Sequence, residues 1–233
     1  MRSACVPGFL PSRNALHFAN RFPDVPPIRI PLGPLPALHV GSAASGLCGG
    51  MALVTCDLWS SGIEPPPDRE PPAPGSHRFR ALVRRQVQSL DALRTPLRFY
   101  DLQAFRPDRP DAVARLVGRR TRTAEMAVVE WPKVRSELDA GRLAPVGLVR
   151  AVGPEPWFLP LHHQAVAYAY EVVDDRLSLR IYDPNHPDDD EVEVRFRLGL
   201  ERRGPGTMLQ TTGEPVFAFW LLPYRPEPVG AWS

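Results

Sequence analysis

The chain has 233 residues, of which 43% are apolar and 23% are charged, and its formal net charge is +2. This length exceeds the ~150-residue norm for a domain by about half, which excludes an array of several domains. It also leaves enough chain to bury a core without disulfides or metals. The three cysteines are too few, and odd in number, for a disulfide framework.

The charge and hydropathy patterns favour neither a nucleic-acid partner nor a membrane. The net charge is small, and the arginines within 78–85 and 115–122 fall on the polar faces of predicted helices. No apolar run is long enough to span a bilayer, and no signal peptide is visible in the first twenty residues. We therefore expect a cytoplasmic protein without nucleic-acid or membrane partners, and its oligomeric state stays open.

Prolines dominate residues 1–41, with eight in the first forty positions. This density disfavours helix and favours extended or turn backbone. Because apolar residues are scattered between the prolines, the predicted structure is an arm that packs on the body of the protein. The remainder, 42–233, is predicted to be a single domain with a helical half at 42–141 and an antiparallel half at 142–233.

Helical periodicity is confined to the first of these halves. Within 42–62, the segment from Cys48 to Trp59 lacks proline and carries apolar residues at helical spacing. Further helices are predicted at 78–94, 110–119 and 131–141, where Pro132 begins the last helix and Gly141 ends it. The proline-rich segment 64–76 is predicted to be an exposed loop.

After Gly141 the period changes from helical to alternating, which predicts β-strands. The predicted strands are 143–150, 163–173, 177–183, 191–198 and 215–224. Short polar turns join the middle strands, so these strands are expected to be antiparallel neighbours. Helices followed by an antiparallel sheet predict the α+β class.

Cys48 stands between glycines at the start of the first predicted helix, in the segment GLCGGM. The unpaired N–H groups and positive potential of a helix N-terminus lower the pKa of a thiol and favour the nucleophilic thiolate. Gly49 and its neighbours would let a substrate backbone approach closely. The competing interpretation is a buried helical cysteine, and this is our interpretation of Cys56, while Cys5 is taken as incidental.

Two histidines open the longest predicted strand, and His163 is the better candidate for a general base. If its side chain shares a face with the alternating alanines that follow, a helix has room to pack there. His162 would then point the other way, although it stays open as the working ring. The competing interpretation of either histidine is an ordinary core or surface residue.

Asp183 ends the next predicted strand, in the segment Tyr182-Asp183-Pro184-Asn185. A tight turn joins this strand to the preceding one, so the hairpin brings Asp183 beside His163. A carboxylate there would orient the imidazole and stabilise its charged form. The alternative is that Asp-Pro-Asn is ordinary turn chemistry.

This order of cysteine, histidine and aspartate resembles that of papain-like cysteine peptidases, most nearly the bacterial branch related to bacteriocin-leader peptidases. The similar segments are His163-Gln164-Ala165-Val166, Asp183-Pro184 and LDAGRLAPVGLV at 138–149, and GLCGGM and HQAVAYAY resemble segments of uncharacterised bacterial proteins. The likeness covers 42–62 and 131–187. It implies a papain-like α+β fold with Cys48 as nucleophile, His163 as general base and Asp183 as the orienting residue, and no cofactor.

The sequence departs from this family in its oxyanion hole. Papain-like peptidases have a glutamine about six residues before the cysteine, where this chain has Ser42, and residues 1–47 contain no glutamine. The candidate substitutes are Ser42, Ser45 or a backbone amide, and Gly49 and Asn185 are candidate supporting residues. Losing one oxyanion donor typically lowers the rate by about 10²–10³.

The sequence as a whole therefore predicts a hydrolase or acyl transferase that acts on an amide or ester bond of a peptide, protein or other acyl substrate. The main alternative is a degenerate papain-like fold that acts as a protein-binding module. A metal site is not expected, because His162, His163, His186 and the acidic run 188–190 match no zinc spacing. The acidic run is interpreted as a solvated turn rather than a calcium site.

Overall fold

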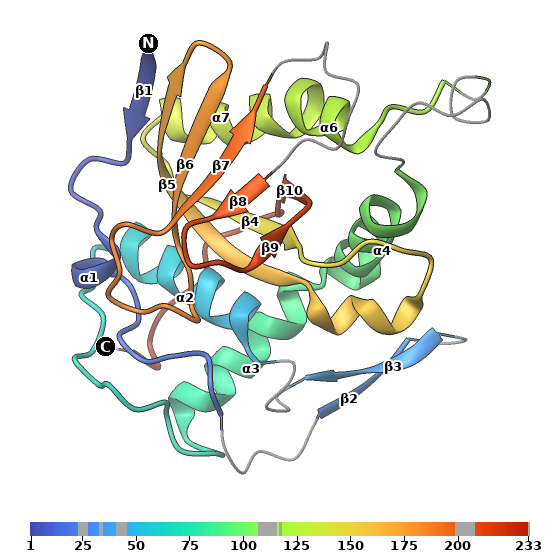
Figure 1. The fold of residues 1–233 in the computed structure, drawn as a ribbon. Helices are drawn as coiled ribbons and strands as arrows, with labels where there is room; N and C mark the ends of the chain where they lie inside the picture. The colour runs from blue at the N-terminus through green and yellow to red at the C-terminus, as the bar shows by residue number, and fades with distance from the viewer. Residues whose placement is uncertain are drawn as a thin grey trace.

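An antiparallel sheet with helices packed against it makes up the protein, which confirms the predicted α+β class (Figure 1). The computed structural model describes residues 1–22, 28–32, 35–40, 46–106, 116, 118–198 and 208–232. Among these residues, no helix has the length and apolar character needed to cross a membrane.

Within the described residues, the main sheet has eight strands, and all their pairings are antiparallel. The order of neighbouring strands in the sheet is β10-β4-β5-β6-β7-β8-β9. Strand β5 pairs with β4 through its first half and with β1 through its second half. The strands are β1 (Arg2–Cys5), β4 (Ala144–Val149), β5 (His163–Val173), β6 (Arg176–Tyr182), β7 (Glu193–Arg197), β8 (Met208–Gln210), β9 (Pro215–Val216) and β10 (Ala218–Leu221).

Four of the five predicted strands correspond to β4, β5, β6 and β7. The prediction of one strand over 215–224 is wrong, because this segment divides at Phe217 into β9 and β10. These two short strands lie at opposite ends of the sheet path, although a single residue separates them. The sheet must therefore curl, so that its two ends approach each other where Phe217 N–H donates to the Val149 carbonyl at 2.8 Å.

The helices and helical turns occupy ten segments of the described chain. They are α1 (Pro11–Asn14), α2 (Cys48–Ser60), α3 (His77–Ser89), η1 (Asp91–Leu93), α4 (Arg94–Tyr100), η2 (Asp101–Phe105), α6 (Arg122–Glu125), η3 (Met126–Glu130), α7 (Trp131–Asp139) and η4 (Pro156–Leu161). The expected helices 48–59 and 131–141 are confirmed as α2 and α7, and Pro132 lies in the first turn of α7 as predicted.

The predicted helix 78–94 is interrupted. Asp91, Ala92 and Leu93 all have positive φ angles, so the chain turns sharply between α3 and α4. The interruption contains neither glycine nor proline, and the apolar stripe continues through it, so the periodicity gave no sign of a break. Most of the predicted helix 110–119 lies outside the described residues.

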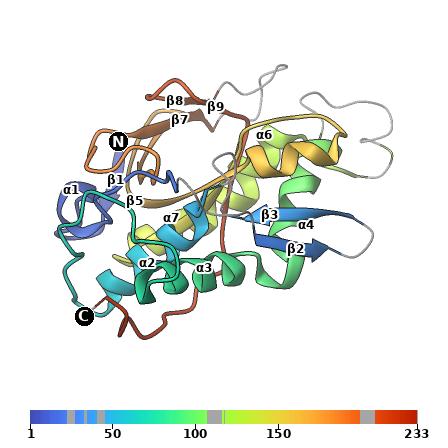
Figure 2. The same cartoon turned by 90° about the horizontal axis from the view of Figure 1, so that it is seen from below.

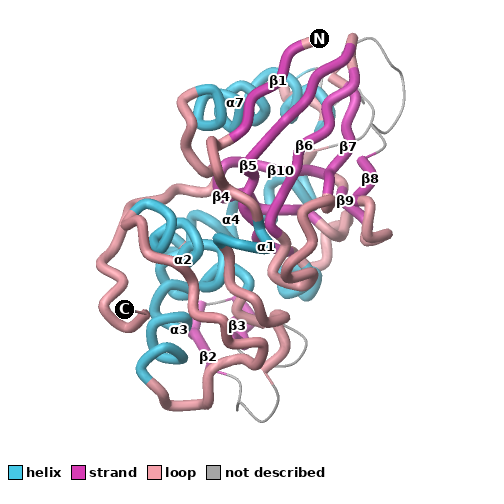
Figure 3. Tube along the Cα trace, turned by 90° about the vertical axis from the view of Figure 1, so that its left-hand side faces the viewer, coloured by secondary structure: helices cyan, strands magenta, loops and turns pink. Residues whose placement is uncertain are grey.

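Helix α2 lies between the sheet and α3, and it is buried on all sides from Cys48 to Leu58 (Figure 3). Ala52 and Cys56 belong to the apolar cluster under the sheet, whereas Met51 and Leu58 belong to a second cluster shared with α3. Figure 2 shows α2 and α3 side by side. A helix with apolar contacts all round is a core helix, so its first residue, Cys48, is held rigidly.

Gly50 allows α2 and α3 to approach each other. A Cβ at this position would lie 2.3 Å from the Leu82 carbonyl oxygen, which is backbone and cannot move aside cheaply. We expect Gly50→Ala to lower the free energy of unfolding by about 1–3 kcal/mol, despite the higher helix propensity of alanine. Urea unfolding of the variant measures this change.

Gly230→Ala is the matched control, because a Cβ at Gly230 would meet nothing within 4 Å. It should unfold within about 0.5 kcal/mol of the wild type. An unchanged midpoint for Gly50→Ala would contradict the close packing of α2 on α3.

The first twenty-two residues lie against the body of the protein. Strand β1 pairs with β5, and Phe9 packs on Trp59 and Tyr168 with ring centroids 5.2 and 5.5 Å away. The expectation that prolines exclude helix here is wrong for the single turn α1. Pro11 is the first residue of this turn, a position whose backbone N–H would have no partner within the helix, so proline costs no hydrogen bond there. Further along, β2 (Ile28–Leu32) and β3 (Leu35–Val40) form a separate two-stranded sheet.

Candidate active site

Cys48 is the first residue of α2, and it is only 6% exposed. The groups that act on its thiol are the ring of His163 and the backbone N–H groups of Gln164 and Gly49, and all three favour the thiolate. A Cβ on Gly49 would clash with Ser89 Oγ at 2.4 Å and with the Gln164 side chain. Close packing against Ser89 and Gln164 therefore requires glycine at position 49.

His163 is the first residue of β5, the strand on which α2 packs. Its Nε2 lies 2.6 Å from Asp183 Oδ1, and its ring interacts electrostatically with the Cys48 thiol beside it. Because Nε2 is engaged by the carboxylate, Nδ1 is the ring nitrogen left to interact with the thiol. The imidazole thus bridges the thiol and the carboxylate, as a general base must.

Asp183 follows the last residue of β6 and is fully buried. The β5–β6 hairpin pairs Val166 with Tyr182, which places Asp183 beside the start of β5 as the sequence predicts. Besides His163, its carboxylate accepts from Gln210 Nε2 at 2.8 Å and from the backbone N–H of Asn185 at 2.9 Å. These donors fix the orientation of the carboxylate towards the imidazole.

The electrostatics of the three groups favour charge separation. Burial alone would raise the pKa of the Cys48 thiol, but the nearby His163 and the hydrogen bonds to the sulfur outweigh it and lower this pKa. Burial likewise opposes a charged His163, yet Asp183 and Cys48 raise its pKa to about 10. The pKa of Asp183 is lowered, against the effect of burial, by His163, Asn185 and Arg150. All three shifts act in the direction of a thiolate beside an imidazolium.

His162 does not take part in this chain of hydrogen bonds. Its Nδ1 accepts from the Arg150 backbone N–H at 3.2 Å, so its Nε2 carries the hydrogen that Gln103 Oε1 accepts at 2.8 Å. The ring stacks on Phe99 with centroids 4.8 Å apart, and burial lowers its pKa to about 4. His162 is thus a neutral structural residue at neutral pH.

A cavity of about 420 Å³ adjoins the cysteine and the histidine. Apart from Cys48 and His163, its lining includes Asn20, Gly46, Arg150, Leu161, Asn185 and Glu214. The guanidinium of Arg150 lies 3.5 Å from Asp183 Oδ2, so a positive charge borders the buried carboxylate. A substrate carbonyl within this cavity would lie next to the thiol.

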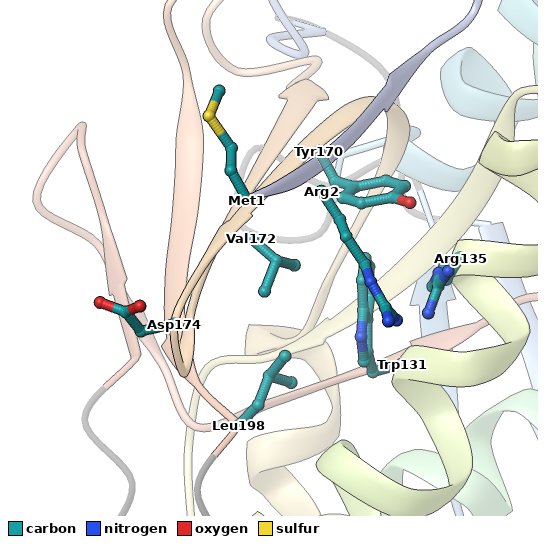
Figure 4. A pocket seen from close by; sticks show the side chains of 8 residues that line it. All are labelled: Met1, Arg2, Trp131, Arg135, Tyr170, Val172, Asp174 and Leu198. Atoms are coloured by element: carbon teal, nitrogen blue, oxygen red, sulfur yellow. The ribbon is translucent and has the colours of Figure 1, made fainter.

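Figure 4 shows a second cavity of similar volume, lined by Met1, Arg2, Trp131, Arg135, Tyr170, Val172, Asp174 and Leu198. Its lining contains neither cysteine nor histidine. The side chains of Arg2 and Arg135 lie near Trp131 and Tyr170 in this view. The arrangement needed for acyl chemistry is thus found in the first cavity.

The acidic run 188–190 binds the first segment of the chain instead of standing free in solvent. Asp190 accepts from the backbone and hydroxyl of Ser12 at 2.8 and 2.7 Å, and Asp188 Oδ1 lies 2.5 Å from His17 Nδ1. The interpretation as a purely solvated turn is therefore wrong. Within the described ranges, no three His, Cys, Asp or Glu side chains are placed to hold a metal ion.

Three polar residues of the site could not be predicted from the sequence pattern, namely Asn20, Arg150 and Gln210. They lie on three separate segments, and none belongs to a local motif, so only the tertiary fold brings them to Asp183 and Cys48. Of the candidate supporting residues, Asn185 acts through its backbone N–H on Asp183. Ser42 and Ser45 lie outside the described residues.

No protein-family model, curated protein or solved structure matches this chain. The chemistry of the site therefore has to be inferred from its own geometry.

Proposed function

We propose that the protein is a cysteine-dependent hydrolase or acyl transferase, which cleaves an amide or ester bond by means of Cys48, His163 and Asp183. The observation that carries the proposal is the buried cluster of thiol, imidazole and carboxylate, in which His163 is hydrogen-bonded to Asp183 and shares a cavity lining with Cys48. A nucleophile bonded to a base that is oriented by a third group is the arrangement of covalent acyl catalysis.

In the proposed reaction, the Cys48 thiolate attacks the substrate carbonyl carbon and forms a tetrahedral oxyanion. His163, as imidazolium, gives its Nδ1 proton to the leaving amine or alkoxide as the bond from the carbonyl carbon breaks. The product of this step is a thioester on Cys48 and a neutral imidazole. The imidazole then removes a proton from water or another acceptor, which attacks the thioester and releases the acyl group and the thiolate.

The arrangement also supports a papain-like fold, which we propose as the finer description of the α+β architecture. A helix that begins at the cysteine packs on an antiparallel sheet whose β5 and β6 carry the histidine and the aspartate. The cavity between these elements is the proposed binding site of a peptide, protein or other acyl substrate.

The pH dependence of thiol alkylation tests the proposed ion pair. At pH 6 we expect iodoacetamide to modify Cys48 at least about tenfold faster than the exposed Cys5, because a free thiol with a pKa near 8.5 is almost fully protonated there. The His163→Ala variant should lose this advantage, since the charge that stabilises the thiolate is gone. Site-resolved mass spectrometry measures both rates across pH 5–9.

His77→Ala is the matched control, because His77 is exposed at the start of α3 and should leave the profile unchanged. If Cys48 titrates like a free thiol and ignores the His163→Ala change, the enzyme proposal fails. The same result would favour the binding-module alternative.

A further inference from the structure

Asn20 reaches the cavity beside Cys48 from a distant part of the chain. Its side-chain Oδ1 accepts a hydrogen bond of 2.6 Å from the backbone N–H of Leu47, the residue before Cys48. Its Nδ2 donates to Asn185 Oδ1 at 3.2 Å. The amide therefore bridges the residue that precedes the nucleophile and the loop that follows Asp183.

These two bonds determine which end of the amide is the donor. An N–H such as that of Leu47 can be accepted only by the amide oxygen, so the other end must be the NH₂ group. One of its two hydrogens is used by Asn185, and the second is left for another acceptor. Because Asn20 lines the same cavity as Cys48, a substrate in that cavity can supply this acceptor.

Gly46 makes this placement possible. A Cβ on Gly46 would lie 2.2 Å from Asn20 Nδ2 and 2.5 Å from its Oδ1, so any other residue would displace the amide. The positive φ of 51° at Gly46 also favours glycine at this point. The backbone before Cys48 is thus shaped around the Asn20 side chain.

We propose that Asn20 is a catalytic residue whose Nδ2–H, together with the backbone N–H of Cys48, stabilises the oxyanion formed when the thiolate attacks the substrate carbonyl. The Cys48 N–H has no partner inside the helix, because Cys48 is the first residue of α2. Two N–H donors of this kind stabilise the charge that develops on the carbonyl oxygen. This inference rests on the proposed function.

The loop after Asp183, which contains the acidic run 188–190, holds the Asn20 segment in place. Asn20 N–H donates to the Pro184 carbonyl at 2.8 Å, and Asp188 and Asp190 bind His17 and Ser12. The loop that begins at the triad carboxylate therefore also positions the Asn20 amide. Two segments more than 160 residues apart in the sequence form one side of the site.

Asn20→Asp and Asn20→Ala test the proposal with p-nitrophenyl acetate as the acyl probe. In Asn20→Asp the carboxylate still accepts from Leu47 N–H but offers no N–H to the oxyanion. We expect both variants to lower kcat for p-nitrophenyl acetate by about 10²–10³, with little change in KM. Alkylation of Cys48 by iodoacetamide should stay within about twofold of the wild type, because this displacement forms no oxyanion.

Asn14→Ala is the matched control, because Asn14 belongs to the same segment but caps the local turn at Leu10, outside the cavity. It should leave both rates unchanged. If Asn20→Asp turned over p-nitrophenyl acetate at the wild-type rate, the proposed role of Asn20 in stabilising the oxyanion would be overturned. Equal losses of acylation and alkylation in both Asn20 variants would also overturn it, since they would indicate a structural role. If the proposed function itself is wrong, the wild type and Asn14→Ala already show neither rapid alkylation nor turnover.

Discussion

Cys48→Ala is expected to abolish turnover of p-nitrophenyl acetate, with a loss of about 10⁴–10⁶ in kcat. The proposed thioester cannot form without the sulfur, and the described residues that line the cavity include no second thiol and no hydroxyl group. The loss should be almost complete because nucleophile and base act as one unit. Steady-state release of p-nitrophenolate at pH 7 measures the effect.

Cys5→Ala is the matched control for this change. Cys5 is exposed in β1, so its removal should leave turnover and stability unchanged. The third cysteine, Cys56, is buried, and burial raises the pKa of its thiol far above the physiological range, which leaves it unreactive. Turnover by Cys48→Ala above about 1% of the wild-type rate would show that another group carries the reaction.

Asp183→Asn is expected to lower kcat by about 10⁴ while the protein stays folded. An asparagine cannot stabilise the imidazolium by charge, and its NH₂ group can force the ring of His163 into the wrong tautomer. The pKa of His163 should fall from its value of about 10, so the rapid alkylation of Cys48 at pH 6 should disappear. The pH profiles of turnover and alkylation check both effects.

The same substitution should also change how stability depends on pH. Asp183 has a lowered pKa in the folded protein, so its ionisation stabilises the fold above about pH 4, the unfolded value, and this stability is lost as the pH falls further. His163 has a raised pKa, so its contribution is complete below about pH 6.5 and is lost as the pH rises towards 10. Urea midpoints between pH 3 and pH 10 should therefore vary less in Asp183→Asn.

Asp174→Asn provides the control, because Asp174 is exposed at the turn between β5 and β6. Its pH profiles should match those of the wild type. A pH dependence in Asp183→Asn that equals the wild-type curve would contradict the coupling between Asp183 and His163.

The sequence was sufficient for the central hairpin and for the cysteine helix. Alternating apolar residues and a short turn defined β5 and β6 closely enough to place His163 beside Asp183. In the structure, His163 Nε2 lies 2.6 Å from Asp183 Oδ1. The segment without proline after Cys48 likewise predicted where α2 begins. These features depend on neighbours within a few residues, or on a tight turn between adjacent strands, so the local pattern contains them.

The tertiary structure alone decided the division of 215–224 into β9 and β10, the turn at 91–93, and the roles of Asn20 and Gln210. The first depends on the curl of the whole sheet, and the second on how α3 and α4 pack against other elements. Asn20 and Gln210 each bind residues that are at least twenty-seven positions away in the sequence. Neither spacing nor periodicity carries such information, because these hydrogen bonds exist only after distant segments have packed together.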